Sequence, residues 1–508
     1  LYSQVQKVQY PKAGESNSAA RIGVVPSAGG ETLWFDIEGD PRNHYLARMD
    51  WAASPDEVYI ERLNRLQNTL ELILADAGTG EVRTILTETD STWVEVVDAI
   101  TWLDDGESFL WVSERDGWNH AWLVSRDGET VELLTPGDWD IASIEGIDPD
   151  EDFLYYRASP DNPAQRYLYR VPLDGSGDAV RLTPDSLSGS SSYNIAPDFE
   201  YAFHNFSTFT EPPVTDLIEL PEHEVIRTVV DNDSLIAAVE KLQRGPVEFF
   251  TVETADGVSL NGWVMKPVNF DPGNKYPVLF YVYGGPGSQT VLDSWGGSRY
   301  LWHRLLTQEG YAVASVDNRG TGMRGRDWRK IIYGRLGVIE TKDQAGAARA
   351  IAQWPWVDST RIGIWGWSYG GFMSLNTLFQ APDVYSTAIS VAPVTHWKYY
   401  DNIYTERYNA LPQSNAAGYD AGSPLSYADS LRGDLLVIHG SGDDNVHFQN
   451  TEALLNALIK AGKQFQFMEY PNRTHGISGG NTQEHLYNLM NRFLDEHLMH
   501  PRQTAMMP

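Results

Sequence analysis

Residues 366–371 read Gly-Trp-Ser-Tyr-Gly-Gly, and this stretch decides how the second half of the chain folds. It follows an apolar run at 361–365 that predicts a buried strand and precedes 372–378, which predicts a helix. So sharp a turn admits only small residues close to its serine, and Gly366 and Gly370 stand two positions before and after it. It lifts the Ser368 hydroxyl above the sheet and points the next backbone N–H toward the same place. The strand–turn–helix setting therefore favours a reactive serine over a bystander.

The part of the chain from about residue 246 alternates strands with helices, which is typical of a mostly parallel sheet. Together with the serine turn, this alternation predicts a doubly wound α/β-hydrolase domain over residues 246–508. The expected strands are 276–282, 311–316, 362–365, 388–391, 435–438 and 465–470, and the expected helices are 341–353 and 483–497.

Residues 1–240 alternate apolar and polar side chains, with turn signals at short intervals, as strands and hairpins do. A weak repeat of about 50 residues, the period of propeller blades, runs through them. Its copies lie at 22–35, 70–86, 121–136 and 167–184, with a fainter one from 214. We predict an all-β propeller portion with about four to five blades visible. Because the first copy begins so early, we expect the propeller to be incomplete at its amino-terminal side.

The composition narrows the range of partners and cofactors. The chain of 508 residues has 69 acidic and 38 basic side chains, a net charge of −31, which disfavours nucleic acid and anionic lipid as partners. No run of about 18 apolar residues occurs, so we expect no membrane span. There is no Cys, which excludes disulfides, thiolate metal sites and a Cys nucleophile. No metal-binding spacing of His and carboxylates is present, and we expect neither metal nor cofactor.

A serine hydroxyl needs a base, and the base needs an orienting carboxylate. In α/β-hydrolases the chain order is Ser, then the acid, then His. The Gly-rich loop after the strand at 435–438 carries Asp443 and Asp444, and the loop after the last expected strand carries His475. We therefore predict a triad of Ser368, Asp443 and His475, with Asp444 as a rival acid that spacing alone does not exclude.

The sequence also indicates roles for two other histidines and for the donors that would stabilise an oxyanion. His439 is expected to be a structural residue at a strand end, and His447 lies too close to Asp443 in sequence to reach the serine. One oxyanion donor is the backbone N–H of Tyr369, fixed by the turn. The hydroxyl of Tyr283, in the loop 283–288, could be a second donor, although a packed aromatic at a strand end is the simpler interpretation.

These stretches resemble the prolyl oligopeptidase family, and most closely its dipeptidyl peptidase IV branch. The matching segments are 283–286, 366–371, 400–408, 439–449 and 475–477. The likeness is specific over about 250–500 and looser through the first half. It implies a β-propeller that caps an α/β-hydrolase, with the active site in the cavity between them.

The resemblance assigns roles residue by residue. It makes Ser368 the nucleophile, Asp443 rather than Asp444 the acid, His475 the base and Tyr283 a side-chain oxyanion donor. Asn445 and Arg407 match positions that hold the substrate backbone. The implied proline pocket consists of Tyr369, Val394, Trp397, Tyr400, Tyr404 and Val446. Without the resemblance, the helical spacing of Trp397, Tyr400 and Tyr404 would indicate core packing.

One feature of the family is missing from this sequence. Its exopeptidases hold the free amino terminus with two adjacent glutamates, and no Glu-Glu pair occurs here. In the family this pair lies upstream of the segment that matches Leu1, so we expect the chain to be a carboxy-terminal portion of a longer protein. The alternative is a loss of dipeptide selectivity.

The sequence therefore predicts a serine exopeptidase that releases amino-terminal X-Pro, and less well X-Ala, dipeptides from peptide substrates. The alternatives are a prolyl tripeptidyl peptidase, a proline-specific endopeptidase, or an inactive homologue that acts as a binding protein. A homodimer is compatible with the family pattern. A periplasmic or secreted location is favoured over a cytoplasmic one.

Overall fold

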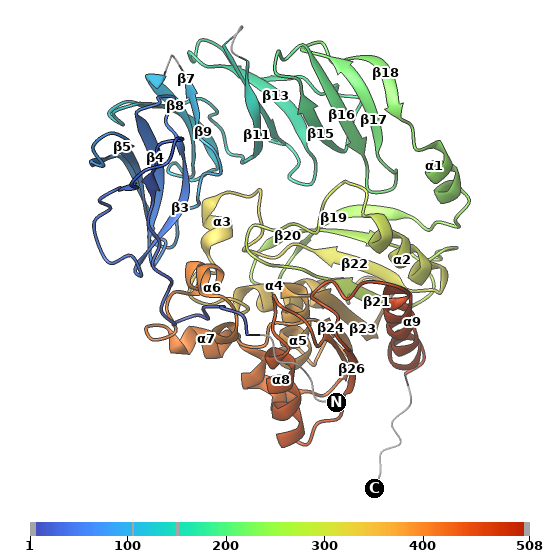
Figure 1. The fold of residues 1–508 in the computed structure, drawn as a ribbon. Helices are drawn as coiled ribbons and strands as arrows, with labels where there is room; N and C mark the ends of the chain where they lie inside the picture. Colours follow the sequence, from blue (N-terminus) through green and yellow to red (C-terminus); the bar gives the residue numbers. More distant parts are fainter. Residues whose placement is uncertain (1–6, 104–105, 149–151, 502–508) are drawn as a thin grey trace.

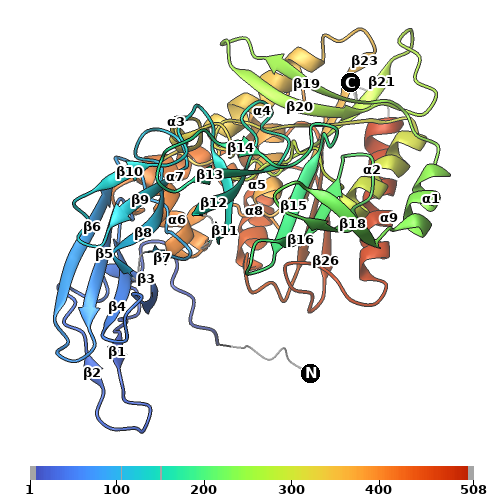
Figure 2. The ribbon, with the colours of Figure 1, turned by 90° about the horizontal axis from the view of Figure 1, so that it is seen from above.

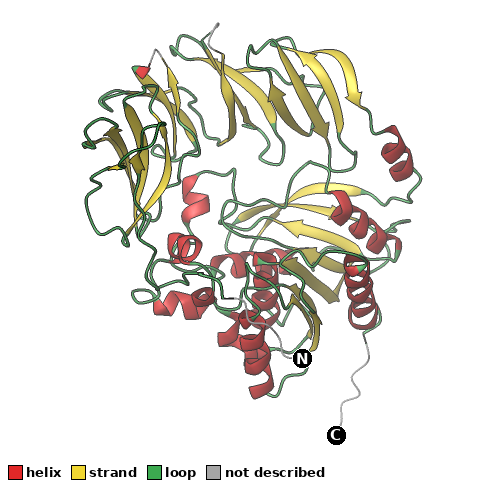
Figure 3. Ribbon diagram, in the orientation of Figure 1, coloured by secondary structure: helices red, strands yellow, loops and turns green. Residues whose placement is uncertain are grey.

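The computed structural model describes residues 7–103, 106–148 and 152–501. Four antiparallel sheets follow one another along an arc, and a mixed α/β unit closes the lower side of this arc (Figure 1). Figure 3 shows the contrast in composition, with strands throughout the arc and nearly all helices in the α/β unit. This contrast matches the change in sequence pattern near residue 246.

The α/β unit is built on one eight-stranded sheet with the order β19-β20-β22-β21-β23-β24-β25-β26. The first two pairings, β19–β20 and β20–β22, are antiparallel, and all the others are parallel. The strands are β19 (Val247–Glu253), β20 (Ser259–Met265), β21 (Tyr276–Tyr281), β22 (Ala312–Val316), β23 (Val357–Trp367), β24 (Thr387–Val391), β25 (Asp434–Gly440) and β26 (Gln466–Tyr470).

The central strands are buried on both faces, which explains their unbroken apolar runs. In β21 and just beyond it, Val278, Phe280 and Val282 belong to one hydrophobic core, whereas Leu279 and Tyr281 belong to the other. The first core includes side chains of α4, α5 and α8, and the second includes side chains of α2 and α9. Helices thus cover both faces, and the prediction of a doubly wound sheet is confirmed.

The helices predicted at 341–353, 372–378 and 483–497 are present, with ends shifted by a few residues, whereas the other α-helices of this unit were not predicted from the sequence. Beside them are 3-10 segments at Trp397–Tyr399 and Pro424–Ser430 and a π-helix at Asp495–Met499. The α-helices are α2 (Gly297–Gln308), α3 (Arg326–Lys330), α4 (Ile339–Ile351), α5 (Tyr369–Gln380), α6 (Asn402–Asn409), α7 (Ala416–Gly422), α8 (Gln449–Lys460) and α9 (Thr482–Leu494).

The first half forms four four-stranded antiparallel meanders and a separate two-stranded pair. The predicted repeats correspond to the two-stranded pair and to the last two strands of each meander, so the prediction of propeller-type sheets is confirmed. The pair is β1 (Gly23–Val24) with β2 (Leu33–Trp34), which projects from the molecule in Figure 2. The meanders are β3 (His44–Trp51), β4 (Glu57–Asn64), β5 (Thr69–Asp76) and β6 (Val82–Thr89); β7 (Thr101–Leu103), β8 (Ser108–Ser113), β9 (His120–Ser125) and β10 (Val131–Leu133); β11 (Ile141–Asp148), β12 (Phe153–Ala158), β13 (Tyr167–Pro172) and β14 (Val180–Arg181); β15 (Ser190–Ile195), β16 (Tyr201–Ser207), β17 (Val214–Glu219) and β18 (Glu224–Val230).

The connection between the two parts contains helix α1 (Asp233–Glu240), after which β19 begins at Val247. The proposed division near residues 240–246 falls between these two elements. The beginning of the described chain departs from it, because residues 10–17 lie against the α/β unit. Ala13 N donates to Tyr400 O at 3.1 Å, and Asn402 N donates to Pro11 O at 3.0 Å. Backbone pairing over a separation of almost 400 residues leaves no trace in local sequence pattern.

Among the described residues, no helix combines the length and apolarity that a membrane crossing requires.

The sheet β15–β18 encloses a cluster of buried polar rings. His204 Nε2 lies 3.0 Å from Ser191 Oγ, and the rings of His204 and His223 are 4.7 Å apart. The Tyr193 hydroxyl lies 3.0 Å from His223 Nε2. Burial and the neighbouring His223 lower the pKa of His204 to about 3. The folded state therefore holds a neutral imidazole that the unfolded chain would protonate below pH ~6.5.

We predict that this imidazole makes the fold sensitive to acid. Because its pKa is lowered on folding, its contribution to stability is present above pH ~6.5 and is lost as the pH falls toward about 3. The slope from one such group is about 1.4 kcal/mol per pH unit. A His204→Gln variant should lose that slope in denaturant titrations between pH 6.5 and 4.5. Equal slopes for the variant and the unaltered protein would contradict the assignment.

Candidate active site

The turn between β23 and α5 is held by close backbone contacts. Ser368 has φ 61° and ψ −117°, an unusual conformation for a residue with a side chain, and its N–H donates to Val391 O at 2.8 Å. A Cβ on Gly370 would lie 2.1 Å from Val282 O, and one on Gly366 would lie 2.5 Å from the same atom. Only glycine fits at these two positions. The half-buried Ser368 side chain is therefore placed at the carboxyl end of β23.

The predicted acid and base are in contact. His475 Nδ1 lies 2.7 Å from Asp443 Oδ2, although the two residues sit in different loops. The Asp443 side chain is fully buried, and 23% of the His475 side chain is exposed. Asp444 is exposed, so the structure brings Asp443 rather than Asp444 to the imidazole. The Ser368 hydroxyl makes no hydrogen bond within the described residues; catalytic hydrogen bonds often tighten only when substrate is bound.

The Asp443 carboxylate is stabilised in its ionised form. Burial opposes ionisation, but hydrogen bonds from His439 and His475 outweigh it and lower the pKa to about 2. The backbone N–H groups of Asn445 and Val446 donate to Oδ1 at 3.0 and 2.9 Å. This carboxylate is therefore charged at neutral pH, as required of a group that orients a base.

His439 contributes to the site in a way that the sequence did not reveal. Its buried ring places Nε2 3.1 Å from Asp443 Oδ2 and 2.9 Å from Val446 O, while Nδ1 lies 2.7 Å from Thr451 Oγ1. Because both partners of Nε2 are acceptors, this nitrogen is the one that donates to them. His439 therefore does more than fill a strand end, which was the expected structural role. It also holds the carboxylate of Asp443, the predicted acid. The spacing of four residues between His439 and Asp443 was the available signal.

The two predicted oxyanion residues lie side by side. The rings of Tyr283 and Tyr369 are 5.9 Å apart, and Tyr369 opens helix α5, where a backbone N–H has no intrahelical acceptor. The Tyr369 hydroxyl donates to the buried carboxylate of Glu340 at 2.7 Å. Burial raises the pKa of Glu340 to about 7, despite hydrogen bonds from Gly337 N and Tyr369. Glu340, which the sequence did not indicate, therefore fixes the Tyr369 ring through a hydrogen bond to its hydroxyl.

The predicted proline-pocket residues form a continuous group of aromatic rings. The Trp397 ring lies 5.3 Å from Tyr369, 5.8 Å from Tyr400 and 5.8 Å from Tyr404. Val394 and Val446 are buried beside them. Their helical spacing is misleading, because Trp397 lies in a 3-10 turn and Tyr404 in the separate helix α6. Such a group of rings can accept a flat apolar ring that has no N–H to satisfy.

The two residues predicted to hold the substrate backbone have different surroundings. The Asn445 side chain accepts from the Tyr400 hydroxyl at 2.7 Å, so it lies at the edge of the aromatic group. Arg407 faces the propeller sheets, where its Nε donates to Gln67 Oε1 at 2.8 Å. Its guanidinium also lies 3.9 Å from the carboxylate of Glu95.

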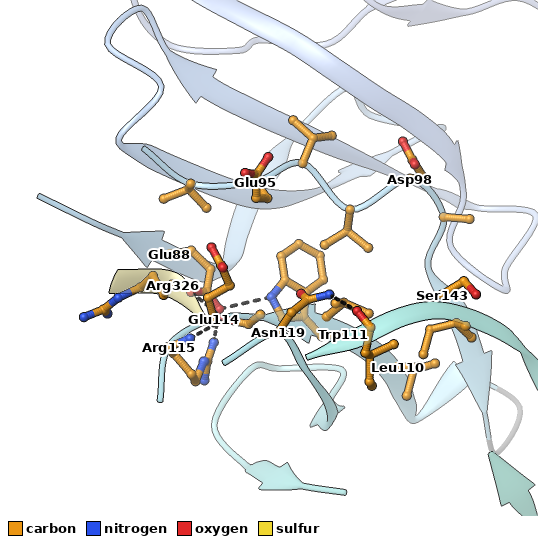
Figure 4. A pocket seen from close by; sticks show the side chains of 18 of the residues that line it. Glu88, Glu95, Asp98, Leu110, Trp111, Glu114, Arg115, Asn119, Ser143 and Arg326 are labelled. Carbon is orange, nitrogen blue, oxygen red and sulfur yellow. Dashed lines mark hydrogen bonds and ion pairs between the residues drawn. The ribbon is translucent and has the colours of Figure 1, made fainter. Parts of the chain in front are cut away.

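A cavity of about 650 Å³ lies where helix α3 meets the propeller sheets. Figure 4 shows Glu95 and Asp98 on one side of it and Glu114, Arg115 and Arg326 on the other. Its charged groups are paired across the junction, for example Lys330 Nζ with Asp90 at 2.9 Å and with Glu114 at 3.1 Å. Ser368, Asp443 and His475 do not line this cavity; Glu95 lines it and lies 3.9 Å from the Arg407 guanidinium.

The described residues contain no cluster of three or more His, Asp or Glu side chains that could hold a metal ion.

An elbow serine, an Asp–His pair at the carboxyl ends of parallel strands, and a cap of propeller sheets are typical of an α/β-hydrolase fold with a propeller domain. Comparison with known families gives the same result. The model of the prolyl oligopeptidase family matches residues 300–500, and that of the dipeptidyl peptidase IV N-terminal region matches residues 1–213. The chain belongs to the prolyl oligopeptidase family.

Similar proteins cover the chain almost completely. The crystal structure of Porphyromonas gingivalis dipeptidyl peptidase 4 superposes with a TM-score of 0.92 at 36% identity, covering 96% of this chain and 69% of that one. The probable dipeptidyl-aminopeptidase B of Botryotinia fuckeliana is 33% identical over 513 residues, 97% of this chain and 55% of its own. The probable dipeptidyl peptidase 4 of Aspergillus fumigatus is 31% identical over 94% of this chain and 65% of its own. The chain thus spans little more than half the length of several curated relatives.

We predict that removing the His439 ring weakens both the fold and the reactivity of the serine. A His439→Phe variant keeps the volume but leaves Thr451 and Val446 without their partner, which should lower the free energy of unfolding by about 1–3 kcal/mol. Because Asp443 loses a donor, the rate at which a fluorophosphonate labels Ser368 should also fall. Exposed His485, which lies 2.8 Å from the Tyr470 hydroxyl, provides the control His485→Phe. Unchanged labelling by His439→Phe would exclude support of the acid.

Proposed function

We propose that the protein is a serine exopeptidase that releases amino-terminal X-Pro dipeptides, and X-Ala dipeptides less well. The observation that carries this proposal is the Asp443–His475 pair beside the Ser368 turn and the aromatic group around Trp397. The names of the relatives, dipeptidyl peptidase and dipeptidyl-aminopeptidase, support the release of dipeptides.

In the proposed mechanism, Ser368 Oγ attacks the carbonyl carbon after the residue held in the aromatic group, and its proton passes to His475 Nε2. Asp443 stabilises the resulting imidazolium through Nδ1. The Tyr369 N–H and the Tyr283 hydroxyl stabilise the oxyanion. Collapse of the intermediate breaks the C–N bond, and His475 gives its proton to the leaving amine. Water, activated by His475, then hydrolyses the acyl-enzyme.

The aromatic group explains the proposed preference for proline. A pyrrolidine ring is flat and apolar, and its nitrogen has no N–H inside a peptide, so rings can enclose it without leaving a donor unpaired. Alanine would fill less of the same space and lose part of the apolar contact.

The first test is replacement of the nucleophile. Ser368→Ala should lower kcat/KM for Gly-Pro p-nitroanilide by at least about 10³-fold, because no other group can form the acyl intermediate. Exposed Ser414, whose Oγ donates to Leu411 O, provides the control Ser414→Ala, which should retain activity. Undiminished turnover by Ser368→Ala would refute the assignment of the nucleophile.

A second test separates dipeptidyl from tripeptidyl or internal cleavage. We expect the protein to hydrolyse Gly-Pro p-nitroanilide at least about tenfold faster than Ala-Ala-Pro or acetyl-Gly-Pro p-nitroanilide, because an exopeptidase must recognise a free amino terminus at a fixed distance. Preferential cleavage of Ala-Ala-Pro would favour a tripeptidyl peptidase. Efficient cleavage of the acetylated amide would favour an endopeptidase.

A further inference from the structure

Helix α6 carries a wall of the aromatic group but depends on contacts outside itself. It has eight residues, Asn402–Asn409, and includes Tyr404 and Arg407. Helices of that length are not stable in water alone. The Asp401 side chain caps its start by accepting from Tyr404 N at 2.8 Å. Gly334, Leu336 and Asn415 of the α/β unit bind the end of the helix at Tyr408 and Asn409. Further polar contacts, which hold the segment around Tyr404, come from the propeller sheets and from the first described residues of the chain.

The turn between β4 and β5 provides an ion pair to α6. Arg65 Nε donates to Glu406 Oε2 and Arg65 NH2 to Glu406 Oε1, both at 2.9 Å. The Glu406 side chain is fully buried, and 16% of the Arg65 side chain is exposed. Glu406 Oε1 also accepts from Gly14 N at 2.7 Å. Two parallel bonds between a planar guanidinium and a carboxylate fix direction as well as distance.

Two residues further along the same turn, Gln67 adds a second clamp. Its fully buried amide donates from Nε2 to Ile403 O at 2.6 Å and accepts from Arg407 Nε at 2.8 Å. Ile403 and Arg407 stand one helical turn apart on either side of Tyr404. The amide therefore fixes the segment of α6 whose ring stacks on Trp397 at 5.8 Å.

We propose that Arg65 and Gln67 are positioning residues that set the selectivity of the aromatic pocket from the propeller side. Neither residue belongs to the pocket itself. Both act by holding α6 so that the Tyr404 ring closes the wall beside Trp397. The proposal rests on the proposed function, since it concerns which residue the pocket accepts before the scissile bond. It implies that a segment over 300 residues away in sequence tunes discrimination between proline and alanine.

The test compares two glutamine variants, each of which removes an uncharged side chain that bonds the propeller sheets to the α/β unit. Gln67→Leu removes the clamp on α6. Gln165→Leu is the matched control, because Gln165 Nε2 donates to Asp293 Oδ2 at 2.9 Å from a different sheet. For each variant, kcat and KM are measured with Gly-Pro and Gly-Ala p-nitroanilides, and hydrogen exchange is measured for the amides of α6.

We expect Gln67→Leu to lower the ratio of kcat/KM for Gly-Pro over Gly-Ala about tenfold, mainly through KM for Gly-Pro, because a misplaced wall loses contact with the larger ring. The amides of α6 should exchange faster. Gln165→Leu should change neither. Arg65→Met should resemble Gln67→Leu, and Arg65→Lys, which keeps the charge, should restore part of the ratio. If Arg65→Met fails to fold, Gln67→Leu, which leaves no buried charge, still decides the outcome.

A selectivity ratio for Gln67→Leu that equals the control would overturn the proposal, even if exchange in α6 rises. If the unaltered protein cleaves neither amide, the proposed function fails instead. Affinity for a pyrrolidine amide, measured by calorimetry, then still tests the wall: weaker binding in Gln67→Leu alone supports the proposal, and equal affinity refutes it.

Discussion

The close approach between the Val282 carbonyl and the glycines of the 366–371 turn is the constraint on which the rest of the site depends. A Cβ at Gly366 or Gly370 would collide with that oxygen. Because the end of β21 and the start of α5 interlock at this point, the residue after Val282 and the residue before Gly370 are brought close together. Those residues are Tyr283 and Tyr369, whose rings lie 5.9 Å apart. One steric contact thus aligns the predicted nucleophile, the predicted backbone donor and the predicted side-chain donor at the same end of the sheet.

A second organising element is the Asp443 carboxylate, which ties three segments of the chain together. It contacts the ring of His475, the ring of His439 and the backbone of Val446. Val446 in turn is buried beside the aromatic group. Orientation of the base and the shape of the pocket therefore share one support, and a change at either place is expected to affect the other.

The sequence predicts this structure best where a pattern of apolar residues or glycines lies within one short segment. Unbroken apolar runs predicted the buried parallel strands, and alternating apolar residues predicted the meanders. The glycines around Ser368 predicted the sharp turn. Other features could not be predicted, because the residues involved are remote from one another in sequence. Three contacts between distant segments are examples: the ion pair of Arg65 with Glu406, the packing of residues 10–17 against the α/β unit, and the hydrogen bond from Tyr369 to Glu340. The ring spacing around Trp397 was ambiguous for the opposite reason, because helical spacing also suits core packing.

The most direct measurement is a crystal structure of the protein with a dipeptide boronic acid that carries a boronate analogue of proline. Our account predicts a covalent bond from Ser368 Oγ to boron, with His475 Nε2 within hydrogen-bond distance of the adduct. It also predicts a boronate oxygen that accepts from the Tyr369 N–H and the Tyr283 hydroxyl, and a five-membered ring among Trp397, Tyr400 and Tyr404. A boronate attached elsewhere, or a His475 ring that stays beyond reach of the adduct, would contradict it.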